Sequence, residues 1–119
     1  MAGDGYMGNA LVKGEGVNQN FTKEEIDEYM KCMSSPMYFA EKYIKVIAPS
    51  KGLVEFKPYP YQKELFKTFN ENRFNIVLAC RQSGKSITTV IYILWYAIFN
   101  PEKTIAILAN KGATAREML

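Results

Sequence analysis

The sequence of 119 residues contains no histidine and only two cysteines, Cys32 and Cys80. The absence of histidine excludes imidazole acid–base chemistry and every metal site that depends on a histidine ligand. The two cysteines lack a paired spacing, and Cys80 lies where an apolar segment meets a loop, a common place for a buried free thiol. We therefore expect a reduced setting without a disulfide framework, and we expect neither thiol to act as a nucleophile.

Long apolar runs and a secretory leader are also missing. The longest apolar stretch, residues 90–99, is about half the length that a membrane span requires. Residues 1–20 lack the basic start and apolar centre of a signal peptide, and they contain five of the eight glycines. We interpret residues 1–20 as a flexible N-terminal arm, and we expect no membrane partner.

The net charge of +3 is small but unevenly distributed. Residues 1–36 carry a net charge of −3, whereas residues 37–119 carry +6. The basic excess gives the second part a weak electrostatic preference for the phosphates of a ligand or of DNA. An ordinary solvated lysine surface is the alternative explanation of the same charges.

Capping signals predict two short helices in the first half of the chain. The first begins after Thr22, whose side chain can cap the amide of Glu25 while Glu25 caps Thr22 in return. The second opens with Ser35 as its cap and Pro36 in its first turn. We assign residues 21–58 to an N-terminal helical segment.

The second helix is expected to continue to Pro49, because its apolar spacing remains helical up to that proline. A turn at residues 50–52 follows. Residues 53–56 alternate only weakly, and Pro58 ends any strand there.

Two apolar segments flank a helix in the second half. Residues 75–80 and 104–109 are apolar on both faces, as buried strands of a parallel sheet are. The stretch from Lys85 to Phe99 carries a wide apolar stripe at helical spacing. This order predicts an α/β fold: a P-loop NTPase with a partial parallel sheet of one βαβ unit, preceded by short N-terminal helices.

Two further helices complete the expected pattern. One begins near Tyr61, and the last begins near Ala113 and reaches Leu119 before completing two turns. We interpret residues 59–119 as the start of a truncated P-loop ATPase domain.

The loop between the first apolar segment and its helix reads Ala-Cys-Arg-Gln-Ser-Gly-Lys-Ser at residues 79–86. A loop that leads into a helix start directs backbone N–H groups and the helix dipole at one point, where a triphosphate binds. Lys85 would contact the outer phosphates and Ser86 would ligate Mg²⁺, although Ala79 replaces the first glycine of the motif. We predict ATP and Mg²⁺ as ligands, and a chance Gly-Lys-Ser at an ordinary helix start is the alternative.

Two side chains extend the predicted site. Gln62 lies on an otherwise apolar helix face, where its carboxamide could match an adenine edge, or it caps the helix or faces solvent. Arg81 could neutralise charge on the γ-phosphate, or it forms a structural salt bridge. We predict Arg81 and Lys85 as catalytic, Ser86 as the Mg²⁺ ligand, and the following nucleotide contacts: Tyr61, Gln62, Arg81, Gln82, Ser83, Gly84, Lys85 and Ser86.

Carboxylates are scarce after the loop. Only Glu102 and Glu117 remain, and neither follows an apolar strand as a magnesium-holding aspartate with an adjacent catalytic glutamate would. A base that activates water is therefore missing where hydrolysis would need one. The sequence predicts ATP binding without hydrolysis.

Three motifs together resemble the large terminase subunit of T4-like tailed bacteriophages, a DNA-packaging ATPase and nuclease. They are Lys-Pro-Tyr-Pro-Tyr-Gln at 57–62, the loop at 79–86, and Ile-Leu-Ala-Asn-Lys-Gly at 107–112. An arginine-bearing loop without the first glycine is typical of that family. The resemblance implies that Gln62 reads adenine, that Arg81 acts on the γ-phosphate, and that Lys85 and Ser86 contact phosphate and Mg²⁺.

The resemblance also implies a motor subunit that uses ATP to package viral double-stranded DNA into procapsids. Its expected partners are DNA, the portal protein, the small terminase subunit and further copies of itself, in the host cytoplasm at the procapsid portal vertex. The chain would be the N-terminal part of such a subunit, inactive alone because it lacks Walker B and nuclease residues. A superfamily-2-like DNA or RNA helicase or translocase, and a nucleotide-binding module without catalysis, remain as alternatives.

Overall fold

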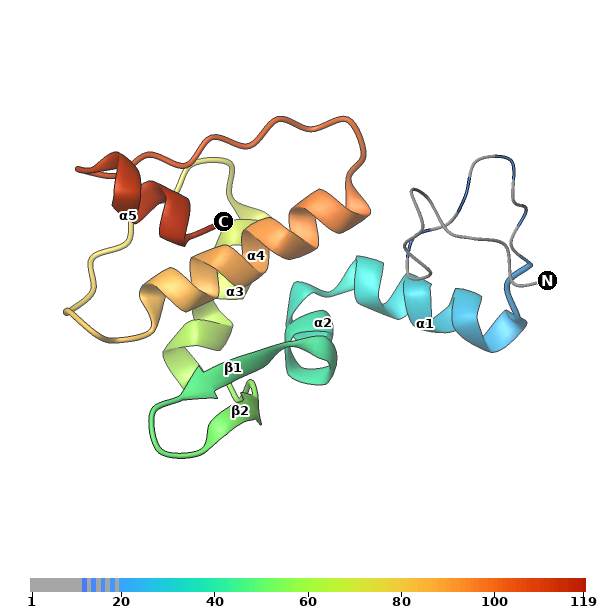
Figure 1. Ribbon diagram of the computed structural model, residues 1–119, viewed down its shortest axis with the longest axis horizontal. Coiled ribbons are helices and arrows are strands. Elements are labelled where there is room, and N and C mark those ends of the chain that lie inside the picture. Colours follow the sequence, from blue (N-terminus) through green and yellow to red (C-terminus); the bar gives the residue numbers. More distant parts are fainter. Residues whose placement is uncertain (1–11, 13, 15, 17, 19) are drawn as a thin grey trace.

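The computed structural model describes residues 12, 14, 16, 18 and 20–119, so the predicted arm at 1–20 lies largely outside the described residues. Figure 1 shows α4 across the centre of the molecule, with α2, α3 and the hairpin below it and α1 extending to one side. The described elements are α1 Lys23–Ser34, α2 Pro36–Tyr43, β1 Lys45–Ala48, β2 Gly52–Glu55, α3 Pro60–Glu71, α4 Lys85–Phe99 and α5 Gly112–Glu117.

Both N-terminal helices begin where their capping residues predict. Thr22 Oγ1 accepts a hydrogen bond from the Glu25 amide at 3.2 Å, and the Glu25 carboxylate accepts one from the Thr22 amide at 2.8 Å. Ser35 Oγ caps α2 by accepting from the Tyr38 amide at 3.2 Å, with Pro36 in the first turn. These bonds satisfy N–H groups that a helix start leaves unpaired, and both predicted starts are confirmed.

The second helix is shorter than predicted. It ends at Tyr43, and the residues expected to continue it to Pro49 form β1, which pairs antiparallel with β2. Val46 lies opposite Val54 in this hairpin, and both are half-buried. The backbone of Gly52 at the turn has a φ of +70°, which glycine adopts without the steric cost of a side chain.

The hydrophobic core consists of two clusters that α4 connects. The first joins α1, α2 and α4, and the indole N–H of Trp95 in it donates to the Cys32 carbonyl at 2.8 Å. The second joins α2, α3, α4 and the residue that follows β2. The buried members are Cys32, Phe39, Trp95 and Phe99 in the first cluster and Ala40, Phe56, Phe66 and Ile91 in the second.

The parallel sheet predicted for the second half does not form in the described part of the chain. Residues 75–80 and 104–109 form no strand and make no backbone–backbone hydrogen bonds there, and Ile76 and Leu78 are 101% and 100% exposed. Only the beginnings of the two segments, Asn75 and residues 104–106, line one cleft together with side chains of α4. An apolar run suits burial, but a strand also needs an adjacent backbone to satisfy its N–H and C=O groups.

The α/β prediction, a P-loop NTPase with one βαβ unit, is therefore wrong. The described residues form a mostly helical small domain with five helices and one antiparallel two-stranded hairpin. The predicted helices themselves are present, since α3, α4 and α5 begin at Pro60, Lys85 and Gly112, within one residue of their predicted starts. The segments on either side of α4, residues 75–80 and 104–109, were expected to be strands and are not.

A polar cluster fastens α1 to α2. The Glu28 carboxylate accepts hydrogen bonds from the hydroxyls of Tyr38 and Tyr43, at 3.0 and 2.8 Å, and pairs with the Lys42 ammonium group. The bonds from Lys42 and then Tyr43 lower the pKa of Glu28 from 4.5 to about 2. The same carboxylate raises the pKa of Lys42 and of Tyr43.

We expect this cluster to make the free energy of unfolding of the protein fall at acid pH. Because the folded pKa of Glu28 is about 2 and its ordinary value is 4.5, its contribution is complete above about pH 4.5. That contribution is lost as the pH falls toward 2. Urea unfolding at pH 7 and pH 3 should show a smaller loss of unfolding free energy for Glu28→Gln than for the wild type. Glu24→Gln, in the first turn of α1, is the control and should lose as much as the wild type. Equal losses for wild type and Glu28→Gln would contradict the assignment.

Candidate phosphate-binding loop

The loop before α4 turns sharply at two residues with left-handed backbone. Gln82 has a φ of +60° and Gly84 a φ of +82°, and a non-glycine residue in this region is uncommon. Within the loop, Ser83 Oγ donates to the Cys80 carbonyl at 2.8 Å. Gly84 is the N-cap of α4 and provides no side-chain cap, so the first amides of this helix are free of the usual side-chain acceptor.

The side chain of Lys85 folds back over the loop. Its Nζ donates to the carbonyls of Cys80 at 3.2 Å and Ala79 at 3.4 Å. The two ion pairs of the described residues use other lysines, Lys42 and Lys63, so no carboxylate there compensates the charge of Lys85. An anion bound at the loop would find this ammonium group within reach.

A cleft of about 1020 Å³ lies between this loop, the start of α3 and the hairpin. Its size is at the upper end of the range of about 300–1,000 Å³ for small-molecule sites. Tyr59 and Tyr61 stand at its edge with stacked rings, 6.2 Å between centroids and 11° between planes. Seven of the eight predicted nucleotide contacts line this cleft: Tyr61, Gln62, Gln82, Ser83, Gly84, Lys85 and Ser86.

Gln62 lies deep between α3 and the loop and is only 3% exposed. Its carboxamide oxygen accepts from the Tyr59 amide at 2.8 Å, which caps the start of α3. Its Nε2 donates to Thr88 Oγ1 at 3.0 Å and to the Gly84 carbonyl at 3.2 Å. Both polar atoms of the Gln62 carboxamide therefore have hydrogen-bond partners within the protein.

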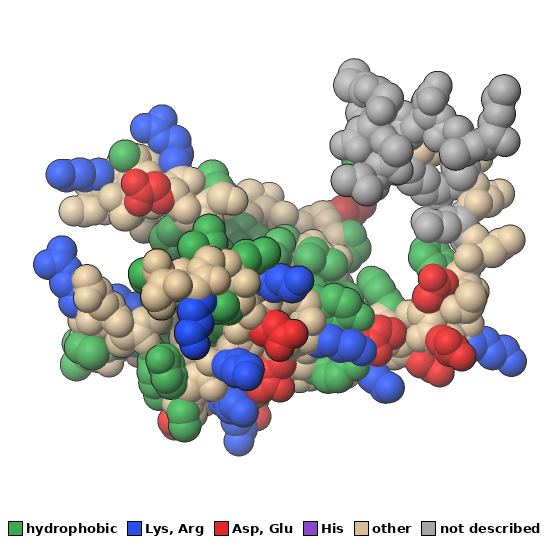
Figure 2. All heavy atoms as spheres, turned by 60° about the horizontal axis from the view of Figure 1, so that its bottom comes forward, with side chains coloured by type: hydrophobic (Ala, Val, Ile, Leu, Met, Phe, Trp, Pro, Cys, Tyr) green, Lys and Arg blue, Asp and Glu red, His purple; other side chains and the backbone are tan. Residues whose placement is uncertain are grey.

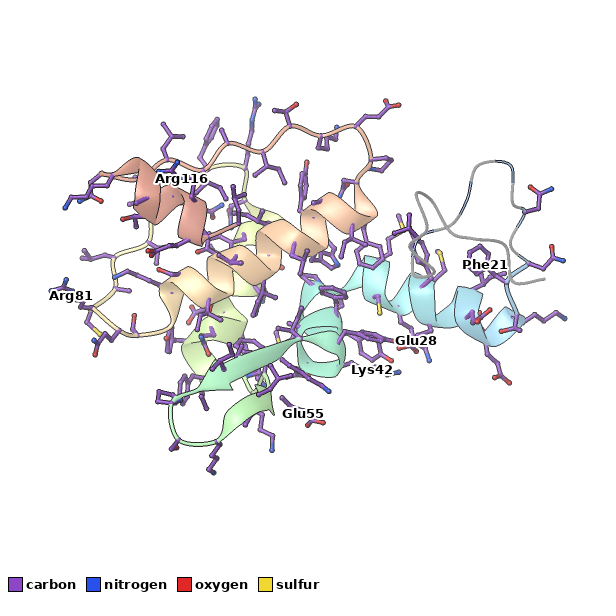
Figure 3. The ribbon with its side chains drawn as sticks, in the orientation of Figure 1. Phe21, Glu28, Lys42, Glu55, Arg81 and Arg116 are labelled. Atoms are coloured by element: carbon purple, nitrogen blue, oxygen red, sulfur yellow. The ribbon has the colours of Figure 1, made fainter. Side chains whose placement is uncertain are left out.

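Arg81 lies apart from the other predicted contacts. It does not line the cleft, its side chain is exposed, and Figure 3 shows it at the outer end of the loop, directed away from the helices. It has no hydrogen-bond or ion-pair partner in the described part of the chain. In Figure 2, basic side chains project from the same end of the molecule as this loop and α5. The predicted catalytic role of Arg81 stays a prediction.

Sequence reasoning missed two residues of this region. Thr88 is completely buried and bonds both Gln62 and Gly84, and its place one turn after the helix start is the only signal in the sequence. Glu55 of β2 is the one carboxylate among the described residues that line the cleft. It was missed because residues 53–56 carry a weak strand pattern and precede the loop.

No protein-family model matches the sequence. Among the described residues, no three His, Cys, Asp or Glu side chains are grouped closely enough to hold a metal ion. The helices described are each too short or too polar to cross a membrane. The resemblance to packaging ATPases therefore rests on the three sequence motifs.

Proposed function

We propose that the loop at residues 79–86 binds the phosphates of ATP together with Mg²⁺. The observation that carries the proposal is the position of Lys85, whose charged Nζ lies over the loop carbonyls beside the uncapped start of α4. Bound phosphate oxygens would accept from Lys85 and from the free amides of the first turn. Ser86 lines the same cleft and would supply the hydroxyl ligand to Mg²⁺.

We further propose that this 119-residue chain binds ATP without hydrolysing it. Glu55, the only carboxylate of the described cleft lining, also lines a second cleft with Glu41 and Lys63. Figure 3 shows it below β2 and directed away from the loop. A base that activates water must lie within hydrogen-bond reach of the water near the γ-phosphate, and Glu55 is unsuited to that role.

Calorimetric titration of the chain with Mg–ATP tests the proposal. Lys85→Ala should weaken binding about 10- to 100-fold, the usual worth of a hydrogen bond to a charged group. Lys31→Ala, at the end of α1 and away from the cleft, is the matched control and should bind as the wild type does. Equal affinity of the Lys85→Ala variant and the wild type would refute phosphate binding at this loop.

The wider proposal places this site in an ATP-driven motor that packages viral double-stranded DNA. It is supported by the motif resemblance, and the proposed partners are DNA, the portal protein and the small terminase subunit at the procapsid portal vertex in the host cytoplasm. A purified portal ring of a T4-like phage should capture the chain if the proposal holds. ATP hydrolysis that nucleic acid stimulates, without portal binding, would favour a helicase or translocase.

A further inference from the structure

The carbonyl of Gly84 accepts three hydrogen bonds. It accepts from the Thr88 amide at 3.1 Å, from Thr88 Oγ1 at 2.9 Å and from Gln62 Nε2 at 3.2 Å. Gln62 Nε2 also donates to Thr88 Oγ1 at 3.0 Å, which closes a triangle of hydrogen bonds. We call these three residues, Gln62, Gly84 and Thr88, the Gly84 clasp.

The clasp joins elements that are distant in the sequence. Gln62 lies in the first turn of α3, whereas Gly84 and Thr88 belong to the loop end and the first turn of α4. Gln62 and Thr88 are 3% and 0% exposed, so solvent cannot replace these bonds without opening the packing. The clasp therefore fixes the left-handed Gly84 and with it the direction of the amides that follow.

Reading an adenine edge requires one free donor and one acceptor from a carboxamide. Gln62 Nε2 already donates within the protein, to the Gly84 carbonyl and to Thr88 Oγ1. Its oxygen accepts one hydrogen bond, from the Tyr59 amide, and keeps a second acceptor position. A nucleobase would have to displace a buried Nε2 bond of the clasp before Gln62 could donate to it.

We infer that Gln62 is a positioning residue, which sets the loop for phosphate and does not select the base. This inference rests on the proposed phosphate binding at residues 79–86. Its consequence is that replacing Gln62 weakens the binding of every ligand that carries a triphosphate, whether or not that ligand has a nucleobase. Thr88, which lies behind the loop and is completely buried, should behave in the same way.

The test compares three probes, Mg–ATP, Mg–GTP and inorganic tripolyphosphate with Mg²⁺, by calorimetric titration. Each of the variants Gln62→Leu and Thr88→Val should bind all three probes more weakly than the wild type, and by the same factor for each probe. We expect about tenfold for a lost buried hydrogen bond. The affinity of the double variant should fall by less than the product of the two single-variant factors, because both substitutions break the same clasp. Thr88→Ser keeps the hydroxyl and should bind all three as tightly as the wild type.

Circular dichroism of each variant establishes that the titrated protein is folded. If Gln62→Leu weakens ATP but leaves tripolyphosphate unchanged, Gln62 reads the base and the inference is overturned. Unchanged affinity of folded Gln62→Leu for all three probes would reduce its role to stability alone and overturn the inference as well. Wild-type protein that binds none of the probes would refute the proposed function itself, a result distinct from both.

Discussion

Replacing Gly84 with alanine is expected to destabilise the protein and to abolish tight phosphate binding. The backbone φ of +82° costs an ordinary residue about 1–2 kcal/mol. In addition, the new Cβ would lie 2.6 Å from Gln62 Nε2 and 3.2 Å from the Tyr61 hydroxyl. The clasp must open to relieve this contact, and its lost hydrogen bonds add about 1 kcal/mol each.

Gly52 provides the matched control for this prediction. Its φ of +70° is similar, but a Cβ there would meet nothing within 4 Å. Gly52→Ala therefore carries the backbone cost alone, and the difference between the two variants isolates the contact with Gln62. Urea unfolding of both variants measures this difference, and titration with tripolyphosphate measures the effect on binding. Equal destabilisation of the two would show that the contact is relieved without cost.

The largest loss of stability is expected for Phe66→Ala. Phe66 is 1% exposed and packs edge-on against Phe56, with ring centroids 6.4 Å apart and planes at 83°. Removing a buried phenyl ring costs about 3–5 kcal/mol, and a small domain has only about 5–15 kcal/mol in total. We expect a large fall in the thermal midpoint, measured by circular dichroism, or loss of the cooperative transition.

Phe74→Ala is the control for the same change at the surface. Phe74 is 83% exposed at the bend just before residues 75–80, so its removal should change the unfolding free energy by no more than about 0.5 kcal/mol. A loss comparable to that of Phe66→Ala would mean that Phe74 is buried and would contradict its exposed position.

Local signals in the sequence predicted the helices well because each helix start is decided within four residues. Thr22 with Glu25, and Ser35 with Pro36, satisfy their own amides and need nothing from the rest of the chain. The hairpin was missed for the opposite reason. Ile44 and Ile47 are three residues apart, a helical spacing, and only the pairing of β1 with β2 decides the strand.

The sequence predicted which residues would lie together at the cleft, except for Arg81, but not all of their contacts. The loop residues line one cleft because they are contiguous, so the motif alone brought them together. The sequence indicated that Gln62 needs a partner, since a polar group on an apolar face costs free energy when unpaired. Which partner it has depends on Thr88, 26 residues away, and on how α3 packs against α4. No local pattern contains that information.

The bond between Trp95 and the Cys32 carbonyl gives the molecule a built-in optical probe. Trp95 is the only tryptophan of the sequence, and its indole is buried where α1 meets α4. A buried indole emits at shorter wavelength than a solvated one, so separation of α1 from α4 should shift the emission to the red. Phe66 and the loop at residues 79–86 lie outside this junction and contribute no tryptophan emission. Tryptophan fluorescence therefore reports on the junction of α1 with α4. Changes confined to the phosphate loop should leave this emission unchanged.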